Sequence, residues 1–401
     1  MISLDDLKAL ARPAQTKIVL LVMDGVGGLP RPFDGKTELE AAQTPNLDAL
    51  ASEGTLGLAD PIAPGITPGS GPGHLGLFGY DPLRFRIGRG VLEAVGIDLQ
   101  LTDRDLAARG NFCSVDAQGL ITDRRAGRIP TETCARLCSL LEKIRIPGVE
   151  VIVRPVREHR FVVLFRGGSL EEGLSETDPQ EIGKPPLPIH GESPQAAHAA
   201  EVANLFVDEA KKALAAEHPA NMVLLRGFSK YPKIPKLTEI YGVRAGVIAV
   251  YPMYRGLARL VGMEAVKAGD TVADEFAALE KNVGRFDFLF VHIKKTDSYG
   301  EDGNFDSKIH VIEEVDRELP RLLALKPDVI VVTGDHSTPA AYRAHSWHPV
   351  PVLLWSKWCR PDGAKSFSER ECRFGGLGHL RSAELMPLMM GYAERLTKYG
   401  A

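Results

Sequence analysis

The chain has 401 residues, of which 44% are hydrophobic and 25% charged, and its formal net charge is −4 at pH 7. This length exceeds that of a typical single core, so we expect two domains. The near-neutral charge balance argues against a basic nucleic-acid-binding surface and against an acidic disordered tail. No apolar stretch reaches transmembrane length, so we expect neither nucleic acid nor a membrane as a partner.

The cysteines and the first residues indicate a cytoplasmic protein. Five cysteines are too scattered, and odd in number, for a disulfide framework: Cys113, Cys134, Cys138, Cys359 and Cys372. The opening segment carries two early aspartates and lacks the basic-then-apolar layout of a signal peptide.

The first predicted elements are a buried strand and a helix. Residues 18–28 (IVLLVMDGVGG) form an apolar run that ends at Asp24, which is typical of a strand covered on both faces. Residues 44–54 predict a helix, with a proline in the first turn and Gly54 as its stop.

Ser70 is the candidate nucleophile. It lies between two glycines in the segment 67–82 (TPGSGPGHLGLFGYDP), a glycine-dense loop that runs into a short helix. Glycines allow close approach of a ligand, and a loop-to-helix junction offers backbone N–H groups to an anion. A serine hydroxyl becomes a good nucleophile only when a base or a metal removes its proton. The alternative is a flexible turn that happens to contain a serine.

The middle of the chain differs in composition and predicts an inserted domain. Residues 98–262 are rich in arginine and lack the acid-ended strand pattern, so we expect an insert between the two parts of one domain, 1–97 and 263–401. The predicted elements are strands at 159–167, 221–228 and 246–252, an amphipathic helix within 192–218 and a loop at 175–194.

Two further buried strands also end in acids. The segment 287–297 ends at Asp297, and 327–339 delivers Asp335 and His336 together. Ligands bind at the carboxyl edge of open α/β sheets, and carboxylate beside imidazole suits Mn or Zn. With Asp24, three strand ends therefore predict a dinuclear metal site. The alternative is that these aspartates only cap turns, beside a surface histidine.

Seven motifs in this order carry a resemblance to a known family. They are VMDGVGG, TPNLDALASEG, TPGSGPGHLGLFGYDP, ARGNFCSVD, TDRRAGRIP, KKTDSYGEDGN and TGDHSTPAAYRAHSWHPVPVLL. Together they resemble the cofactor-independent phosphoglycerate mutases of the archaeal type, which belong to the alkaline phosphatase superfamily. The resemblance implies an α/β fold with an alkaline-phosphatase-like, mostly parallel central sheet flanked by helices, and an inserted α+β second domain.

The resemblance also implies two divalent metal ions and no 2,3-bisphosphoglycerate. Mn is expected, with Mg, Co or Zn as alternatives. By motif position one ion would be held by Asp24, Ser70, Asp335 and His336, and the other by Asp297, Glu301 and His345. The family often has histidine where this chain has Glu301, so Asp302 or His348 could complete the second site instead.

The inserted domain should bind the rest of a small phosphorylated substrate. Arginine suits carboxylate and phosphate groups, which favours Arg125 and Arg128. Further candidates are Asn111, His159, Arg160, Asp178 and Arg255, together with Lys230, Lys233 and Lys236. The general acid or base could be His74, His159 or Asp178, and the sequence does not choose among them. We expect His292 to be a core histidine.

The activity implied is the interconversion of 3-phosphoglycerate and 2-phosphoglycerate in glycolysis and gluconeogenesis. Phosphate would pass to Ser70 and return to the other hydroxyl, while the insert retains glycerate and excludes water. Alternatives within the superfamily are a phosphatase, a phosphonate hydrolase or an ATP-dependent phosphotransferase. An alternative of another class is an inactive metal-binding regulatory protein.

Overall fold

The computed structural model describes residues 2–400 and contains two compact units. Unit 1 is formed by the chain up to Arg86 and from Ile234 onward, and unit 2 by Ile87–Lys233. The insert therefore differs from the expected 98–262 at both ends. Residues 89–96 form a helix that packs on strands of unit 2, and residues 245–249 form a strand of the sheet of unit 1.

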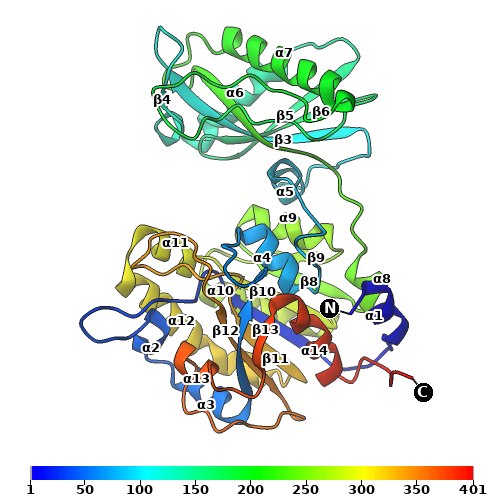
Figure 1. Cartoon of the computed structure of the whole chain (residues 1–401), viewed down its shortest axis with the longest axis vertical. Coiled ribbons are helices and arrows are strands. Elements are labelled where there is room, and N and C mark those ends of the chain that lie inside the picture. Colours follow the sequence, from blue (N-terminus) through cyan, green and yellow to red (C-terminus); the bar gives the residue numbers. More distant parts are fainter. Residues whose placement is uncertain (1, 401) are drawn as a thin grey trace. The chain divides into compact units, whose positions relative to one another are not determined.

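Unit 1 is built on an eight-stranded sheet of order β13-β2-β12-β11-β1-β10-β8-β9, in which only β12 runs against the others (Figure 1). The expected mostly parallel sheet is confirmed. Its strands are β1 (Ile18–Met23), β2 (Thr55–Asp60), β8 (Ala245–Ala249), β9 (Glu264–Val266), β10 (Phe288–Ile293), β11 (Val329–Thr333), β12 (Val350–Ser356) and β13 (Gly378–Arg381). The central strands are buried on both faces, which explains their unbroken apolar runs.

Helices cover both faces of this sheet. One face packs against α2 (Glu38–Ala41), α3 (Pro45–Glu53), α10 (Val272–Asn282), α12 (Phe305–Ala324) and α13 (Glu369–Cys372). On the other face Phe78, at the end of α4 (Ser70–Leu77), contacts Phe290 of β10. The remaining helices of unit 1 are α1 (Leu4–Leu10), α8 (Leu237–Tyr241), α9 (Pro252–Leu260), α11 (Lys295–Asp302) and α14 (Leu385–Tyr392), with short 3-10 turns at Val283–Arg285 and Ser382–Glu384.

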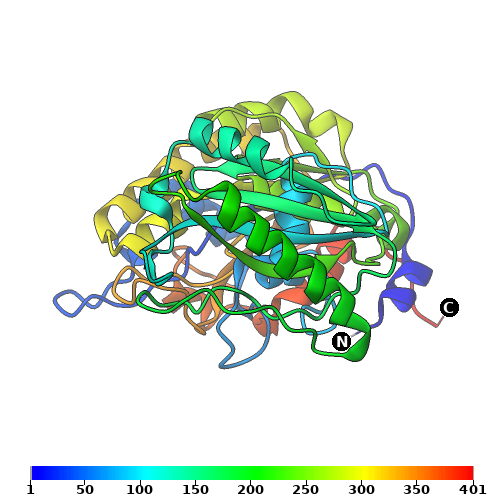
Figure 2. The same cartoon turned by 90° about the horizontal axis from the view of Figure 1, so that it is seen from above.

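Unit 2 is an antiparallel sheet with helices on both faces. Its strands are β3 (Asp105–Val115), β4 (Ile121–Asp123), β5 (Val149–Arg157), β6 (Arg160–Gly167) and β7 (Met222–Lys230). The long strand β3 pairs with β4, β6 and β7. Two helices, α6 (Thr131–Leu141) and α7 (Ala197–Ala213), lie over one face, as Figures 1 and 2 show, and share its apolar core.

The opposite face of this sheet is covered in part by α5 (Arg89–Gly96) (Figure 1). The contact is close because Gly90 lies against the backbone of Ala107, where a Cβ atom would come within 2.4 Å of the carbonyl oxygen. The expected loop at 175–194 is confirmed, whereas the expected helix at 192–218 is shorter. A 3-10 turn, Pro194–Ala196, precedes α7, and another spans Ala126–Arg128. None of the helices within residues 2–400 is both long and apolar enough to cross a membrane.

Candidate active site

The topology of unit 1 brings the three acid-ended strands together. Strand β1 lies between β10 and β11 and is parallel to both, so the carboxyl ends of the three strands meet at one edge of the sheet. Asp24 follows β1, Asp335 follows β11, and Asp297 lies in the first turn of α11 after β10. All three side chains are buried.

Asp24, Asp335 and His336 form the first group of candidate metal ligands. The Nε2 atom of His336 is 3.2 Å from Asp24 Oδ1 and 3.2 Å from Asp335 Oδ2. The hydroxyl of Ser70, the first residue of α4, is 3.2 Å from the same nitrogen. The structure therefore places Ser70 beside the acids and imidazole with which the sequence associated it.

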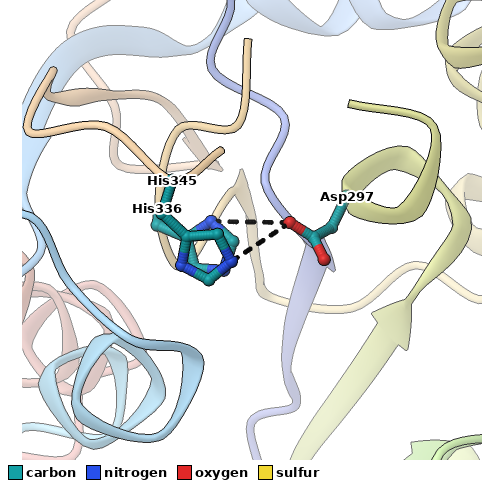
Figure 3. Close-up of side chains that lie close together, drawn as sticks. All are labelled: Asp297, His336 and His345. Carbon is teal, nitrogen blue, oxygen red and sulfur yellow. Dashed lines mark ion pairs between the residues drawn. The ribbon is translucent and has the colours of Figure 1, made fainter. Parts of the chain in front are cut away.

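Asp297, His336 and His345 form the second group, shown in Figure 3. His345 Nε2 lies 3.5 Å from Asp297 Oδ1, and His336 Nδ1 lies 3.9 Å from the same oxygen. The two imidazole rings stack with their centroids 3.7 Å apart. His336 is thus shared by the two groups, each of its nitrogens facing one of them.

The first group fits a divalent cation. Asp24 Oδ1 and Asp335 Oδ2 are buried and accept no hydrogen bond from the residues described, although both face His336. Buried carboxylate oxygens without partners are costly, and a bound cation would satisfy them. Carboxylate oxygens with imidazole nitrogens form a ligand set that suits Mn or Zn.

The other oxygen of Asp24 accepts from two donors and lies beside the ring of His292. Tyr254 donates to Oδ2 at 2.5 Å, Lys294 Nζ lies 3.0 Å away and His292 Nε2 lies 3.2 Å away. Burial alone would raise the pKa of Asp24, but Lys294 and His292 outweigh it and hold that pKa well below its usual range. Asp24 is therefore a carboxylate whose Oδ2 accepts hydrogen bonds and whose Oδ1 remains available to a metal ion. His292 is fully buried on β10, as expected of a core histidine, and its ring also lies beside this carboxylate.

Lys294 also contacts the second group, because its Nζ lies 2.5 Å from Asp297 Oδ2. Burial lowers the pKa of Lys294, but Asp24 and other anionic neighbours raise it well above its ordinary value. For His336, burial is likewise outweighed by Asp335 and Asp24, which raise the pKa of the imidazole to about 9. Lys294 and His336 thus place positive charge beside the three aspartates.

His74 lies within the protein interior and does not reach solvent. Its side chain is fully buried, and its Nδ1 lies 3.1 Å from Asp335 Oδ2 and 2.8 Å from the carbonyl oxygen of Ser70. The ring packs against Tyr254 and His292. This position suits the orientation of Asp335 better than proton transfer to a substrate.

The three candidates for the last ligand of the second group differ in position. Glu301 is half-exposed, with Oε1 3.8 Å from His345 Nε2, and lies near the group without joining it. Asp302 is exposed at the end of α11. His348 stacks on Trp347, and its Nδ1 lies 3.0 Å from the Ser346 hydroxyl.

Unit 2 presents a cationic cluster on the sheet face that carries α5. His159 is buried, and burial together with the positive charge of Arg160, Arg109, Arg125 and Arg128 lowers its pKa to about 4. Asn111 lies opposite Arg160 on the paired strands β3 and β6. His159 Nδ1 and Asn111 Oδ1 are buried and have no hydrogen-bond partner among residues 2–400. Four insert residues that were expected from the sequence therefore lie near His159: Asn111, Arg125, Arg128 and Arg160.

Other expected substrate residues lie elsewhere. Asp178 is bound by Arg124 at 2.9 and 2.7 Å, and this pairing outweighs burial and lowers the pKa of Asp178, which makes it a poor proton donor. Arg255 belongs to α9 in unit 1, where it donates to the carbonyl oxygen of Val250 at 3.0 Å. The expectation that Arg255 lies in the insert is therefore wrong. The three candidate lysines stand at the end of β7 and in the segment after it: Lys230, Lys233 and Lys236.

Several residues of the site were not anticipated. Tyr254 and Lys294 bind Asp24, Thr338 donates to Asp297, and Glu93 of α5 lies 3.8 Å from Arg109 in the cationic cluster. Burial raises the pKa of Glu93 although Arg109, Arg160 and Arg89 oppose it. Of these residues, only Lys294 could have been found from the sequence, because it directly follows a predicted buried strand that leads to Asp297.

This fold and these ligand groups define an α/β metalloenzyme. A family model described as 2,3-bisphosphoglycerate-independent phosphoglycerate mutase matches residues 51–221. A probable 2,3-bisphosphoglycerate-independent phosphoglycerate mutase of Thermotoga neapolitana is 53% identical over 388 residues, 96% of each chain. One from Thermus thermophilus is 50% identical over 400 residues, 98% of each chain.

Two solved structures are similar along almost the whole chain. A protein of Pyrococcus horikoshii has a TM-score of 0.84 and 32% identity, covering 97% of this chain and 100% of that one. The cofactor-independent phosphoglycerate mutase of Thermoplasma acidophilum has a TM-score of 0.73 and 30% identity, covering 94% and 100%. The chain belongs to the 2,3-bisphosphoglycerate-independent phosphoglycerate mutases. It is an isomerase that interconverts phosphoglycerates, and the family depends on metal. The hydrolase, ATP-dependent and inactive alternatives are not supported by these relatives.

Proposed function

We propose that Ser70 carries the phosphoryl group between the two hydroxyl positions of glycerate. The observation behind this proposal is the 3.2 Å separation of Ser70 Oγ from His336 Nε2, beside the first group of candidate metal ligands. Ser70 is also the first residue of α4, where backbone N–H groups favour an anion. No other serine hydroxyl among residues 2–400 contacts the side chain of a ligand-group residue.

The reaction then has two balanced halves. In the first, the bond from Ser70 Oγ to phosphorus forms while the bond from phosphorus to the C3 oxygen of 3-phosphoglycerate breaks, and the serine proton ends on the C3 oxygen. In the second, the C2 oxygen takes the phosphoryl group and its proton returns to Ser70. The net change is isomerisation, with no proton or water consumed.

Asp24, Asp335 and His336 would hold one divalent ion with Ser70, and Asp297 and His345 would hold the other, completed by Glu301. We expect manganese, because the ligand set is rich in carboxylate oxygen. Bound ions would supply positive charge that favours the serine alkoxide and offsets the charge of the phosphoryl group. Tyr254 and Lys294 fix the orientation of Asp24, so its open oxygen points to a defined place.

The cationic cluster of unit 2 would bind the carboxylate of the substrate. Guanidinium groups form paired hydrogen bonds with carboxylates, and the neutral His159 and Asn111 can accept or donate to hydroxyl groups. A cytoplasmic location agrees with a glycolytic substrate and with five unpaired cysteines.

Phosphoserine formation can be tested directly by rapid quenching with labelled 3-phosphoglycerate. We expect acid-stable label on the wild-type protein and on Ser52→Ala, which changes an exposed serine on α3, but none on Ser70→Ala. Label on Ser70→Ala, or turnover without any labelled protein, would refute the proposed intermediate. Assays of the chelated enzyme with Mn, Mg, Co or Zn then identify the ion that restores the mutase.

Substrate binding by unit 2 can be tested with Arg160→Met. Loss of a charged hydrogen bond to the carboxylate should raise KM at least tenfold, equivalent to about 1.4 kcal/mol or more. Arg136→Met is the control, because Arg136 is half-exposed on α6 and pairs with Glu217. Equal KM values for the two variants would remove Arg160 from the proposed binding site.

A further inference from the structure

His336 presents a question of ligand assignment, because it belongs to both groups. Its Nε2 faces Asp24, Asp335 and Ser70, and its Nδ1 faces Asp297. A neutral imidazole has one lone pair and one N–H, so it can serve as a ligand through only one nitrogen. The position of the remaining proton therefore decides which ion His336 binds.

The Thr338 hydroxyl lies between His336 and Asp297. Its Oγ1 is 2.7 Å from Asp297 Oδ1 and 2.9 Å from His336 Nδ1. The carboxylate can only accept, so the single hydroxyl proton of Thr338 points to Asp297. The lone pair of Oγ1 then faces Nδ1, which satisfies both partners only when Nδ1 carries a proton. The resulting chain runs from His336 Nδ1–H to Thr338 and from Thr338 to Asp297.

The backbone holds Thr338 firmly in this place. Its N–H donates to the carbonyl oxygen of Gly25 at 3.1 Å, and its own carbonyl oxygen accepts from the buried ammonium of Lys308 at 2.9 Å. Gly25 adopts φ +66°, and a Cβ there would come within 2.5 Å of Thr338 Oγ1. The side chain is fully buried, so water does not compete for the hydroxyl.

We infer that Thr338 is a positioning residue that keeps the proton on Nδ1 of His336, so that this histidine serves the first group alone through Nε2. This inference rests on the proposed metal site. The second ion would then be held by Asp297 and His345 and would need a further ligand. Glu301 would supply it. It also keeps a donor on Asp297 Oδ1, so the carboxylate has a preferred orientation.

Two substitutions separate the hydroxyl from the shape of the residue. Thr338→Val keeps the branched shape and removes the hydroxyl, which leaves Nδ1–H buried without an acceptor. Thr338→Ser keeps the hydroxyl and should restore the wild-type behaviour. Thr333→Val is the matched control, because Thr333 is equally buried and its hydroxyl donates to the carbonyl oxygen of Pro351 at 2.9 Å.

The experiment uses the full chain loaded with zinc, which is diamagnetic, and records nitrogen-15 and proton NMR spectra of the imidazoles. We expect wild type and Thr338→Ser to show a slowly exchanging Nδ1–H on His336 and a zinc-bound Nε2. In Thr338→Val the slow proton should disappear, and calorimetry should show zinc affinity of the first group reduced about 10- to 100-fold. Thr333→Val should match wild type in both measurements.

The possible outcomes distinguish this inference from the metal site itself. Zinc bound through Nδ1 of His336 in the wild-type protein would overturn the inference alone, even if the valine variant failed to fold. Unchanged spectra and affinity in Thr338→Val would do the same. Absence of zinc binding by the wild type would overturn the proposed metal site together with the inference.

Discussion

The phenol of Tyr254 offers a sharp test of how the buried partners of Asp24 govern metal binding. Tyr254 donates to Asp24 Oδ2 at 2.5 Å, and burial, with Asp24 next to it, raises the pKa of the phenol well above 10, so it remains a neutral donor. Tyr254→Phe removes this one donor and keeps the ring that stacks on His292 with centroids 3.8 Å apart. The aspartate would then be held less firmly and would bind a metal ion less well through Oδ1.

The expected magnitude follows from the number of donors. A hydrogen bond to a charged group contributes about 1.5–3 kcal/mol, and Asp24 Oδ2 keeps the donor Lys294, with the ring of His292 nearby. The bond exists both with and without metal, so only part of its energy bears on affinity. We therefore expect a loss of about 1.4 kcal/mol, equivalent to a tenfold weaker affinity for the divalent ion.

Calorimetric titration of the metal-free variant with Mn²⁺ measures this directly. Tyr80→Phe is the control, since Tyr80 is also fully buried in unit 1 and its phenol donates to the carbonyl oxygen of Pro235 at 2.7 Å, away from both ligand groups. Weaker binding in Tyr254→Phe alone would support the role of the phenol. Equal affinities in the two variants would show that the phenol does not orient Asp24 for metal.

Three further predictions concern residues around the site. Glu275→Gln should stabilise the protein by about 1–3 kcal/mol near pH 8 and by nothing near pH 4 in denaturant unfolding, because burial, partly offset by Lys295, raises the pKa of Glu275 to about 9. A raised carboxyl pKa gives stability that is present below the ordinary value of 4.5 and is lost as the pH rises towards 9; an equal gain at both pH values would contradict this. Lys308→Met should destabilise the fold by about 3–5 kcal/mol, measured in the same way, because it leaves the buried carboxylate of Glu38 without its counter-charge and takes one donor from three carbonyl oxygens; a smaller loss than about 1 kcal/mol would argue against that network. Glu301→Ala should lower the metal content by elemental analysis from two ions per chain towards one, and unchanged content would leave His345 and its neighbours as sufficient ligands.

The proximity of the three aspartates could be predicted because it follows from the apolar sequence pattern of buried parallel strands. Unbroken apolar runs indicate strands buried on both faces, and such strands are parallel and end at a common edge. Asp24, Asp297 and Asp335 follow strands that prove to be adjacent, so their proximity needs only the sheet order β11-β1-β10. The order itself was not readable from the sequence, but any order with these three as neighbours gives the same cluster.

The partners of Asp24 could not be predicted for a different reason. Tyr254 comes from α9, which the sequence assigned to the insert because strand β8 before it resembles the strands there. Parallel pairing of β8 with β10 places that helix over the edge with the acids. A local pattern shows that a strand exists, whereas the sheet it joins depends on long-range pairing. The same error placed Arg255 in unit 2.

The cationic cluster shows a similar limit. Composition indicated many arginines in the middle of the chain, and motif position selected Arg125 and Arg128. Neither signal distinguishes an arginine on the open face of the sheet from one paired at the surface. The alternation of β3 decides this: Arg109 and Asn111 point away from the core, whereas Phe112 joins it.

The ammonium of Lys294, which touches one acid of each ligand group, has a consequence for the life of the protein before it meets metal. It acts as a built-in counter-ion, so three clustered aspartates need not repel one another in a newly made chain. Folding can thus be complete before any metal ion binds. Uptake of the ions then becomes an exchange of one set of positive charges for another within a finished scaffold.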